Sequence, residues 1–309
     1  MKLPYKRTFS IIFLLIISYF IGRVLYREWD KISGYNWSPD VILLVFSVLT
    51  LYLVYILGGY GWILIIRMLG VRVNFSKGIS IYLLSLFGRY IPGGVWTLLG
   101  RVYLCRMEGI PDSRVGISTI LEQAYPIVSA GFVFAASLLF WKDVNHITKL
   151  FPILIIIPLF IVFIHPKFFL KIINPVISRL GKTPINISLS FNNMLLLVCY
   201  YSLTWMVTGT AFYIFIYSFY PLGFSYIPVL SGIYAISFVA GYVTFLTPAG
   251  LGVREGSMVI LLSLIMPTPI AIGIALLSRL WLIGVELTLL LFFLIDFDTR
   301  KMAKAALGW

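Results

Sequence analysis

The chain has 309 residues, of which 61% are hydrophobic and only 11% are charged, and its mean hydropathy is +1.00. A soluble protein of this length cannot bury so much apolar surface, so we expect an all-α polytopic membrane protein. The formal net charge of +13 comes from 24 Lys and Arg against 11 Asp and Glu, placed mostly in short loops between apolar runs. This distribution favours contact with anionic lipid and argues against nucleic-acid binding.

Apolar runs predict about eight transmembrane helices plus one re-entrant hairpin, since a helix of about 20 residues crosses the bilayer core. We expect a single integral membrane domain, 1–309, because no polar stretch within it is long enough to form a soluble domain. The predicted runs are 9–26, 40–66, 115–140, 150–164, 191–217, 227–246, the short run 257–266, and 270–295. In the second run, the small residues of Gly58-Gly59-Tyr60-Gly61-Trp62 let another helix approach closely.

The first interruption of the apolar pattern is the stretch 88–96, which reads Gly88-Arg89-Tyr90-Ile91-Pro92-Gly93-Gly94-Val95-Trp96. The apolar run before it, 79–87, is too short to cross a bilayer. Non-helical backbone at membrane depth persists only where protein or a water-filled cavity satisfies its hydrogen bonds. Basic residues on both sides of 78–99 indicate that this segment enters and leaves on one face of the membrane, as a re-entrant hairpin.

A basic amphipathic segment, 166–184, divides the chain. Lysines and arginines alternate there with apolar side chains, a pattern typical of a short helix that lies in the membrane interface. The segment separates a first half, 1–140, from a second half, 191–296.

The second half contains its own interruption, 247–256, which reads Thr247-Pro248-Ala249-Gly250-Leu251-Gly252-Val253-Arg254-Glu255-Gly256. Two segments interrupted by proline and glycine, one in each half, are a sequence signal of a transporter's binding site. The same pattern is compatible with an inverted-repeat arrangement of the two halves.

The distribution of basic residues predicts the orientation. With the N-terminus inside, 16 Lys and Arg lie on the cytoplasmic side, Arg101 among them, five lie outside and three lie at membrane depth. The positive-inside rule therefore places both termini in the cytoplasm. We expect a multi-pass protein of the cell (plasma) membrane.

Arg89 and Arg254 are the strongest candidates for a binding site, because a charged residue at membrane depth is costly and generally functional. Either could hold a phosphate or carboxylate headgroup, with backbone N–H groups around Gly93 and Gly94 as further donors. The structural alternative is a clamp, in which Arg89 bonds loose carbonyl groups or a buried acid. Arg254 could likewise pair with its neighbour Glu255, or across to the first interruption.

Four further charges belong to the candidate set. Arg101 is either part of the first site or a cytoplasmic loop charge. Glu122 lies within the run 115–140, whereas Arg279 and Glu286 share one face of the last run, because seven residues make two helical turns. Glu122 and Glu286 could act as counter-ions to Arg89 and Arg254. Together with Arg279 they could also form structural pairs or take part in a proton relay.

Motifs of soluble enzymes are not found in the sequence. There is no Walker loop, dinucleotide fingerprint, nucleophile triad or zinc spacing, so we expect no enzymatic activity, no cofactor and no metal. Asp296-Phe297-Asp298 is similar to the metal motif of sugar-nucleotide enzymes, but its position after the last run favours a solvated helix end.

The two interruptions, together with Gly100-Arg101, resemble the flippase-like transmembrane region of lysylphosphatidylglycerol synthases and their stand-alone relatives. The resemblance covers essentially the whole chain. In fused members this region moves an aminoacylated phospholipid between leaflets, while a cytosolic domain absent from this sequence makes the lipid. The resemblance implies a functional core of Arg89, Pro92, Gly93, Gly94, Trp96, Arg101, Pro248, Gly250, Gly252, Arg254 and Glu255.

The favoured function is translocation of a phosphate-bearing lipid or lipid-linked sugar between leaflets. The expected partners are membrane lipids, either anionic phospholipids or polyprenyl-phosphate-linked substrates, and a separate synthase or glycosyltransferase is a further candidate. The alternative is a membrane-embedded partner or transferase subunit for the synthesis of lipid-linked glycans or aminoacyl lipids. A transferase requires a general base or a metal, whereas a recruiting partner would depend on the segment 166–184.

Overall fold

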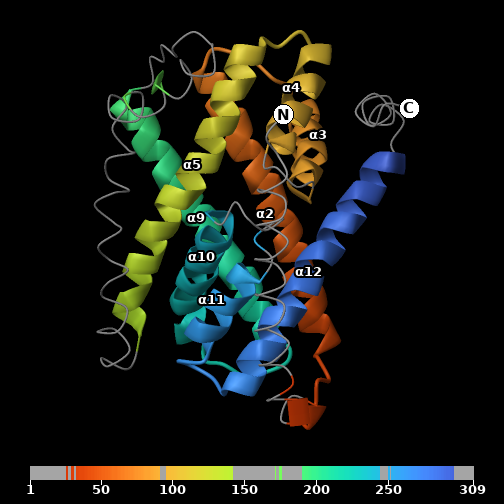
Figure 1. Ribbon diagram of the computed structural model, residues 1–309, viewed down its shortest axis with the longest axis vertical. Helices are drawn as coiled ribbons and strands as arrows, with labels where there is room; N and C mark the ends of the chain where they lie inside the picture. The colour runs from red at the N-terminus through yellow and green to blue at the C-terminus, as the bar shows by residue number, and fades with distance from the viewer. Residues whose placement is uncertain are drawn as a thin grey trace, which may run out of the picture.

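The computed structural model describes residues 26, 29–30, 33–90, 95–141, 171, 174–175, 190–243, 250 and 252–295. Every regular element within these ranges is helical, which confirms the all-α class for the described part of the chain (Figure 1). The α-helices are α2 (Val41–Met68), α3 (Phe75–Leu86), α4 (Trp96–Met107), α5 (Asp112–Ser137), α9 (Phe191–Tyr217), α10 (Ile227–Val243), α11 (Val253–Leu262) and α12 (Thr268–Ile295). Three short 3-10 helices adjoin them: η1 (Phe87–Tyr90), η2 (Leu138–Phe140) and η3 (Phe224–Tyr226).

Five of the described helical segments are long and apolar enough to cross a membrane: Val41–Met68, Asp112–Phe140, Phe191–Tyr217, Phe224–Val243 and Thr268–Leu289. They confirm five of the eight predicted runs. The short run 257–266 is not a span, since α11 has 10 residues and extends only about 15 Å. The runs 9–26 and 150–164, and nearly all of the amphipathic segment 166–184, lie outside the described residues.

Polar residues at the ends of the apolar runs determine where the helices begin. The carboxylate of Asp40 accepts hydrogen bonds from the backbone N–H groups of Ile42 and Leu43, which caps α2. Asn74 caps α3 and Ser190 caps α9 in the same way. Caps of this kind satisfy donors that have no partner within the helix, and so they mark each helix start.

Small residues bring the helices together, as the sequence predicted for 58–62. A methyl group on Gly59 would lie 2.7 Å from the side chain of Ile79 in α3, and one on Gly61 would lie 2.7 Å from the hydroxyl of Tyr201 in α9. Gly209 of α9 approaches α10 even more closely, because a methyl group there would lie 2.4 Å from Cα of Ser231. Close backbone approach gives membrane helices their packing contacts, since lipid provides no hydrophobic force between them.

The helices on either side of the first interruption, α3 and α4, pack as a hairpin, and its re-entrant placement in the membrane stays a prediction. Helices α3 and α4 have 12 residues each and extend about 18 Å, so neither crosses a membrane. They lie side by side and run antiparallel (Figure 1). Lys77 at the start of α3 binds Glu108 just after α4, while Gly88 packs against the backbone of Thr97 at the other end.

The second interruption also joins two packed helices. Gly241, near the end of α10, lies against Gly250 and Arg254, so that α11 folds back along α10. Gly250 and Gly252 have φ angles of 68° and 86°, which an L side chain rarely adopts. The conformation explains why glycine occupies both positions.

The two hairpins enter from opposite ends of α2. The first lies beside the end of α2, from which the chain leads directly into α3. The second begins and ends near the start of α2, where Asp40 donates its N–H to Ser218 and Trp37 packs on Gly273 of α12. Figure 1 shows α3 and α4 at the upper end and α11 in the lower half. This opposed placement agrees with the inverted-repeat arrangement that the sequence suggested.

Candidate functional site

Four arginines lie at or near the interruptions, and three glutamates from neighbouring helices surround them. Arg89 belongs to η1, Arg101 to α4, Arg254 to α11 and Arg279 to α12. The glutamates are Glu122 of α5, Glu255 of α11 and Glu286 of α12. All seven were predicted as candidate residues, and the structure determines which of them pair.

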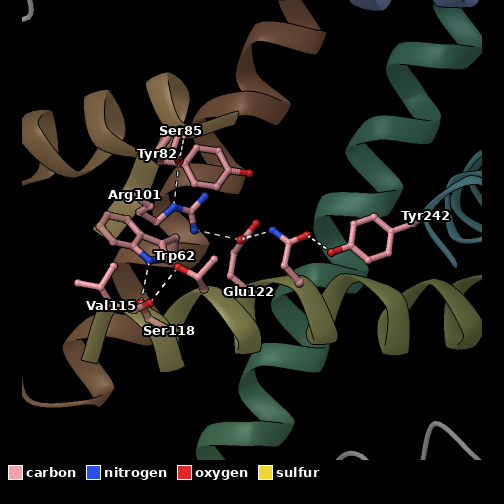
Figure 2. A network of polar contacts seen from close by, with 10 residues as sticks. Trp62, Tyr82, Ser85, Arg101, Val115, Ser118, Glu122 and Tyr242 are labelled. Atoms are coloured by element: carbon pink, nitrogen blue, oxygen red, sulfur yellow. Dashed lines mark hydrogen bonds and ion pairs between the residues drawn. The ribbon is translucent and has the colours of Figure 1, made fainter. Parts of the chain in front are cut away.

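Arg101 is fully buried and forms an ion pair with Glu122. Its Nη1 donates to Glu122 Oε2 at 3.0 Å, and its Nε donates to Ser85 Oγ at 3.0 Å (Figure 2). The guanidinium also lies over the rings of Trp62 and Tyr82, at 5.2 and 4.9 Å from their centroids. Arg101 is therefore part of the protein interior, and counting it among the cytoplasmic loop charges was wrong.

The network around Arg101 continues across α5 to the second hairpin. Gln123 donates through Nε2 to Glu122 Oε2 at 2.7 Å, and Tyr242 donates through its hydroxyl to Gln123 Oε1 at 2.6 Å. Tyr242 lies in the last turn of α10, directly before the second interruption (Figure 2). A continuous chain of polar contacts thus links the two hairpins. Tyr242 was not among the residues predicted from the sequence. The sequence feature that could have identified it is a polar aromatic residue beside the second interruption.

Arg89 pairs with Glu286 of the last helix. Tyr55 of α2 donates its hydroxyl to the same carboxylate oxygen, and Arg89 Nη2 lies 3.4 Å from that hydroxyl. The arginine side chain is 29% exposed, whereas that of Glu286 is 6% exposed. The structure thus brings together Arg89 and Glu286, and the counter-ion role of Glu286 in function stays a prediction.

Glu255 pairs with Arg279, not with its neighbour Arg254. The Glu255 Oε1 atom lies 3.5 Å from Arg279 Nη1, and its Oε2 accepts the backbone N–H of Gly252 at 2.7 Å. The second contact caps α11. Both oxygens of Glu255 are therefore engaged away from Arg254.

Arg254 has no carboxylate partner among the described residues. Its guanidinium lies over the ring of Tyr234 of α10, 4.8 Å from the centroid, and the residue is 6% exposed. The Nη2 atom is buried and has no hydrogen-bond partner in the described part of the chain. Arg101 Nη2 and Arg279 Nε also lack a hydrogen-bond partner there, but these arginines each pair with a glutamate. Since an unpaired buried charge is strongly unfavourable, Arg254 is the position where an anion is most needed.

The remaining predicted site residues divide into two groups. Trp96 begins α4 and is 44% exposed, while Gly250 and Gly252 form the turn before α11. Pro92, Gly93, Gly94 and Pro248 lie outside the described residues.

A cavity of about 380 Å³ among the described helices is apolar, and none of the four arginines lines it. Residues of α2, α9 and α12 line it, among them Val48, Phe215 and Trp281. The charged side chains themselves are packed into the helical bundle. Within the described ranges, no group of three or more His, Cys, Asp or Glu side chains is arranged to hold a metal ion.

The membrane-spanning helices define a polytopic membrane protein, and buried arginine–glutamate pairs lie within its helical bundle. The family model of the lysylphosphatidylglycerol synthase TM region matches residues 8–298. The chain belongs to this family, as the two interruptions suggested. No curated protein matches the sequence.

Proposed function

We propose that the protein is a lipid translocase that moves a phosphate-bearing lipid or a lipid-linked sugar between leaflets. The observation that carries this proposal is Arg254, whose buried guanidinium has an aromatic neighbour but no carboxylate among the described residues. A guanidinium cannot lose its proton, and its planar N–H groups match the oxygens of a phosphate.

The stacking of Arg254 on Tyr234 supports this role. The guanidinium lies over the ring, 4.8 Å from its centroid, and its Nη2 atom has no hydrogen-bond partner among the described residues. A phosphate at Nη2 would satisfy both the charge and the unused donor. Because Arg254 is only 6% exposed, the headgroup gains access when α11 moves relative to α10.

Translocation requires the headgroup to pass through the protein while the acyl or prenyl tails stay in lipid. The first hairpin is suited to such a movement, because neither α3 nor α4 is long enough to be a complete span. In the second hairpin the short helix α11 is the part that can move, relative to the membrane-spanning α10. The sequence contains no ATP-binding motif, so transport runs downhill or uses an ion gradient through Glu122 or Glu286. We place the protein in the cell membrane.

The experiment is a transbilayer movement assay with purified protein in liposomes and labelled anionic, aminoacylated and polyprenyl-phosphate lipids. Arg254→Gln should slow transport by about tenfold or more, the factor that corresponds to about 1.4 kcal/mol of lost binding. It should not lower stability, since it removes an unpaired buried charge. Arg89→Gln should reduce both transport and stability, because it removes the cation that pairs with the buried carboxylate of Glu286.

Arg106→Gln is the matched control. This arginine pairs with Asp112 at the exposed end of α4, and its loss should leave transport unchanged. If Arg254→Gln transports as well as the wild type, the translocation site is misplaced. If folded protein moves no lipid at all, the alternative role as a partner or transferase subunit takes its place, and shortening the segment 166–184 then tests recruitment.

A further inference from the structure

The charges at the two interruptions do not balance. The candidate site contains four arginines and three glutamates. The parts of the two interruptions that lie outside the described residues, 91–94, 244–249 and 251, add no charged residue to this count. Their sum is one positive charge, which Arg254 carries. In a low-dielectric interior this excess is unfavourable until an anion neutralises it.

Each glutamate is already engaged by two donors. Glu122 accepts from Arg101 and Gln123, and Glu255 accepts from Gly252 and pairs with Arg279. Glu286 pairs with Arg89 and accepts from the hydroxyl of Tyr55. The charge of each carboxylate is therefore already matched by an arginine, with which a cationic group on a ligand would have to compete.

We infer that the transported headgroup is a phosphodiester with one negative charge and no cationic group. This inference rests on the proposed function and specifies its substrate class. One phosphodiester neutralises Arg254, whereas a diphosphate brings at least one charge for which the site has no cation. A headgroup with an ammonium group brings a second positive charge next to Arg254, which has no carboxylate partner among the described residues.

Two sources provide such a headgroup. Phosphatidylglycerol is a glycerophospholipid with a single phosphodiester charge, and a sugar linked to a polyprenyl chain through one phosphate carries the same charge. The charge balance selects a single negative charge, the proposed function makes its carrier a phosphodiester, and the assay decides between the two tails.

The test compares labelled lipids of different charge in liposomes that contain the full-length protein. The monoanionic pair consists of phosphatidylglycerol and a polyprenyl monophosphate sugar. The comparison set contains phosphatidylethanolamine, lysyl-phosphatidylglycerol and a polyprenyl diphosphate sugar. We expect at least one monoanionic lipid to move tenfold or more faster than every lipid of the comparison set, and the faster member identifies the tail.

A charge variant tests the balance directly. Glu255→Gln keeps an oxygen that can accept the N–H of Gly252, but it removes the carboxylate that pairs with Arg279 and raises the excess among the seven site residues to two positive charges. The rate for the diphosphate lipid should then rise relative to the monophosphate lipid. Glu108→Gln makes the same charge change at the surface pair with Lys77 and should leave the ratio unaltered.

The possible results of these assays distinguish the inferred charge selection from the proposed translocation activity. Equal movement of a monoanionic lipid and any lipid of the comparison set would overturn the charge selection and leave translocation intact. Failure of folded protein to move any lipid would overturn the proposed function itself. If Glu255→Gln does not fold, the wild-type lipid series still decides the question.

Discussion

The ion pair between Arg101 and Glu122 allows a quantitative test of how far the site depends on burial. Glu122→Ala leaves Arg101 with Ser85 and two aromatic rings as partners, and because the arginine is fully buried, water cannot replace the carboxylate. Breaking a buried pair by removing one partner costs about 3–5 kcal/mol. A single charge at the centre of a membrane helix costs about 2.5–3.5 kcal/mol on insertion scales. We expect the free energy of unfolding to fall by about 3 kcal/mol.

The surface pair of Lys77 and Glu108 is the matched control. Its atoms are closer, at 2.7 Å against 3.0 Å for Arg101 and Glu122, but the lysine side chain is 57% exposed. Exposed pairs contribute about 1 kcal/mol or less. Glu108→Ala should therefore cost much less than Glu122→Ala, although distance alone predicts the opposite order.

The assay is reversible unfolding in mixed detergent micelles, followed by tryptophan fluorescence. A third variant, Arg101→Met with Glu122→Leu, removes both charges and should recover part of the loss, because no unpaired charge remains. If Glu122→Ala unfolds no more easily than Glu108→Ala, the reasoning from burial fails. Equal losses in the double variant and Glu122→Ala would show that packing, not charge, holds this site together.

Two further substitutions test the second hairpin. Gly250→Ala should lower the melting temperature in detergent, because φ is 68° and the new methyl group would lie 2.7 Å from Cα of Gly241. Gly256→Ala is its control, since nothing lies within 4 Å and alanine should stabilise α11 by about 0.5–1 kcal/mol. Tyr242→Phe removes the hydrogen bond to Gln123 and should slow transport with a loss of stability of about 1 kcal/mol. An unchanged transport rate in this variant would mean that the polar chain between the hairpins is only structural.

The sequence was sufficient to locate both interruptions and to predict the first hairpin. Proline and glycine inside apolar runs identify the places where a helix must end, and the short run 79–87 excludes a complete crossing. These signals are local, so they can be seen without a structure. The same is true of 58–62, where small residues predicted the close approach of other helices.

The pairing of charges could not be predicted, because helical periodicity determines a shared face and not the neighbour opposite it. Arg279 and Glu286 do lie seven residues apart on α12, yet they bind Glu255 of α11 and Arg89 of η1. Arg101 was counted as a loop charge because its burial depends on Glu122, which lies on another helix. Spacing along one helix contains no information about such contacts.

Geometry also changes which residues of the two hairpins correspond. The sequence pairs Arg89 with Arg254, since each lies close to a proline and glycines. In the structure Arg101 is the better counterpart of Arg254, because each lies on the helix after an interruption and stacks on a tyrosine of the helix before it, at 4.9 Å and 4.8 Å.

Arg101 and Arg254 differ in whether a carboxylate neutralises the guanidinium. Arg101 has Glu122 as a built-in anion, whereas Arg254 has no such partner among the described residues. The first hairpin therefore contains a guanidinium that a carboxylate neutralises, Arg101, and the second contains one without such a partner among the described residues, Arg254. A bound phosphodiester at Arg254 would take the position in the second hairpin that a glutamate holds in the first, and its departure would restore the imbalance. Under the proposed function, this imbalance favours binding of an anionic headgroup at Arg254.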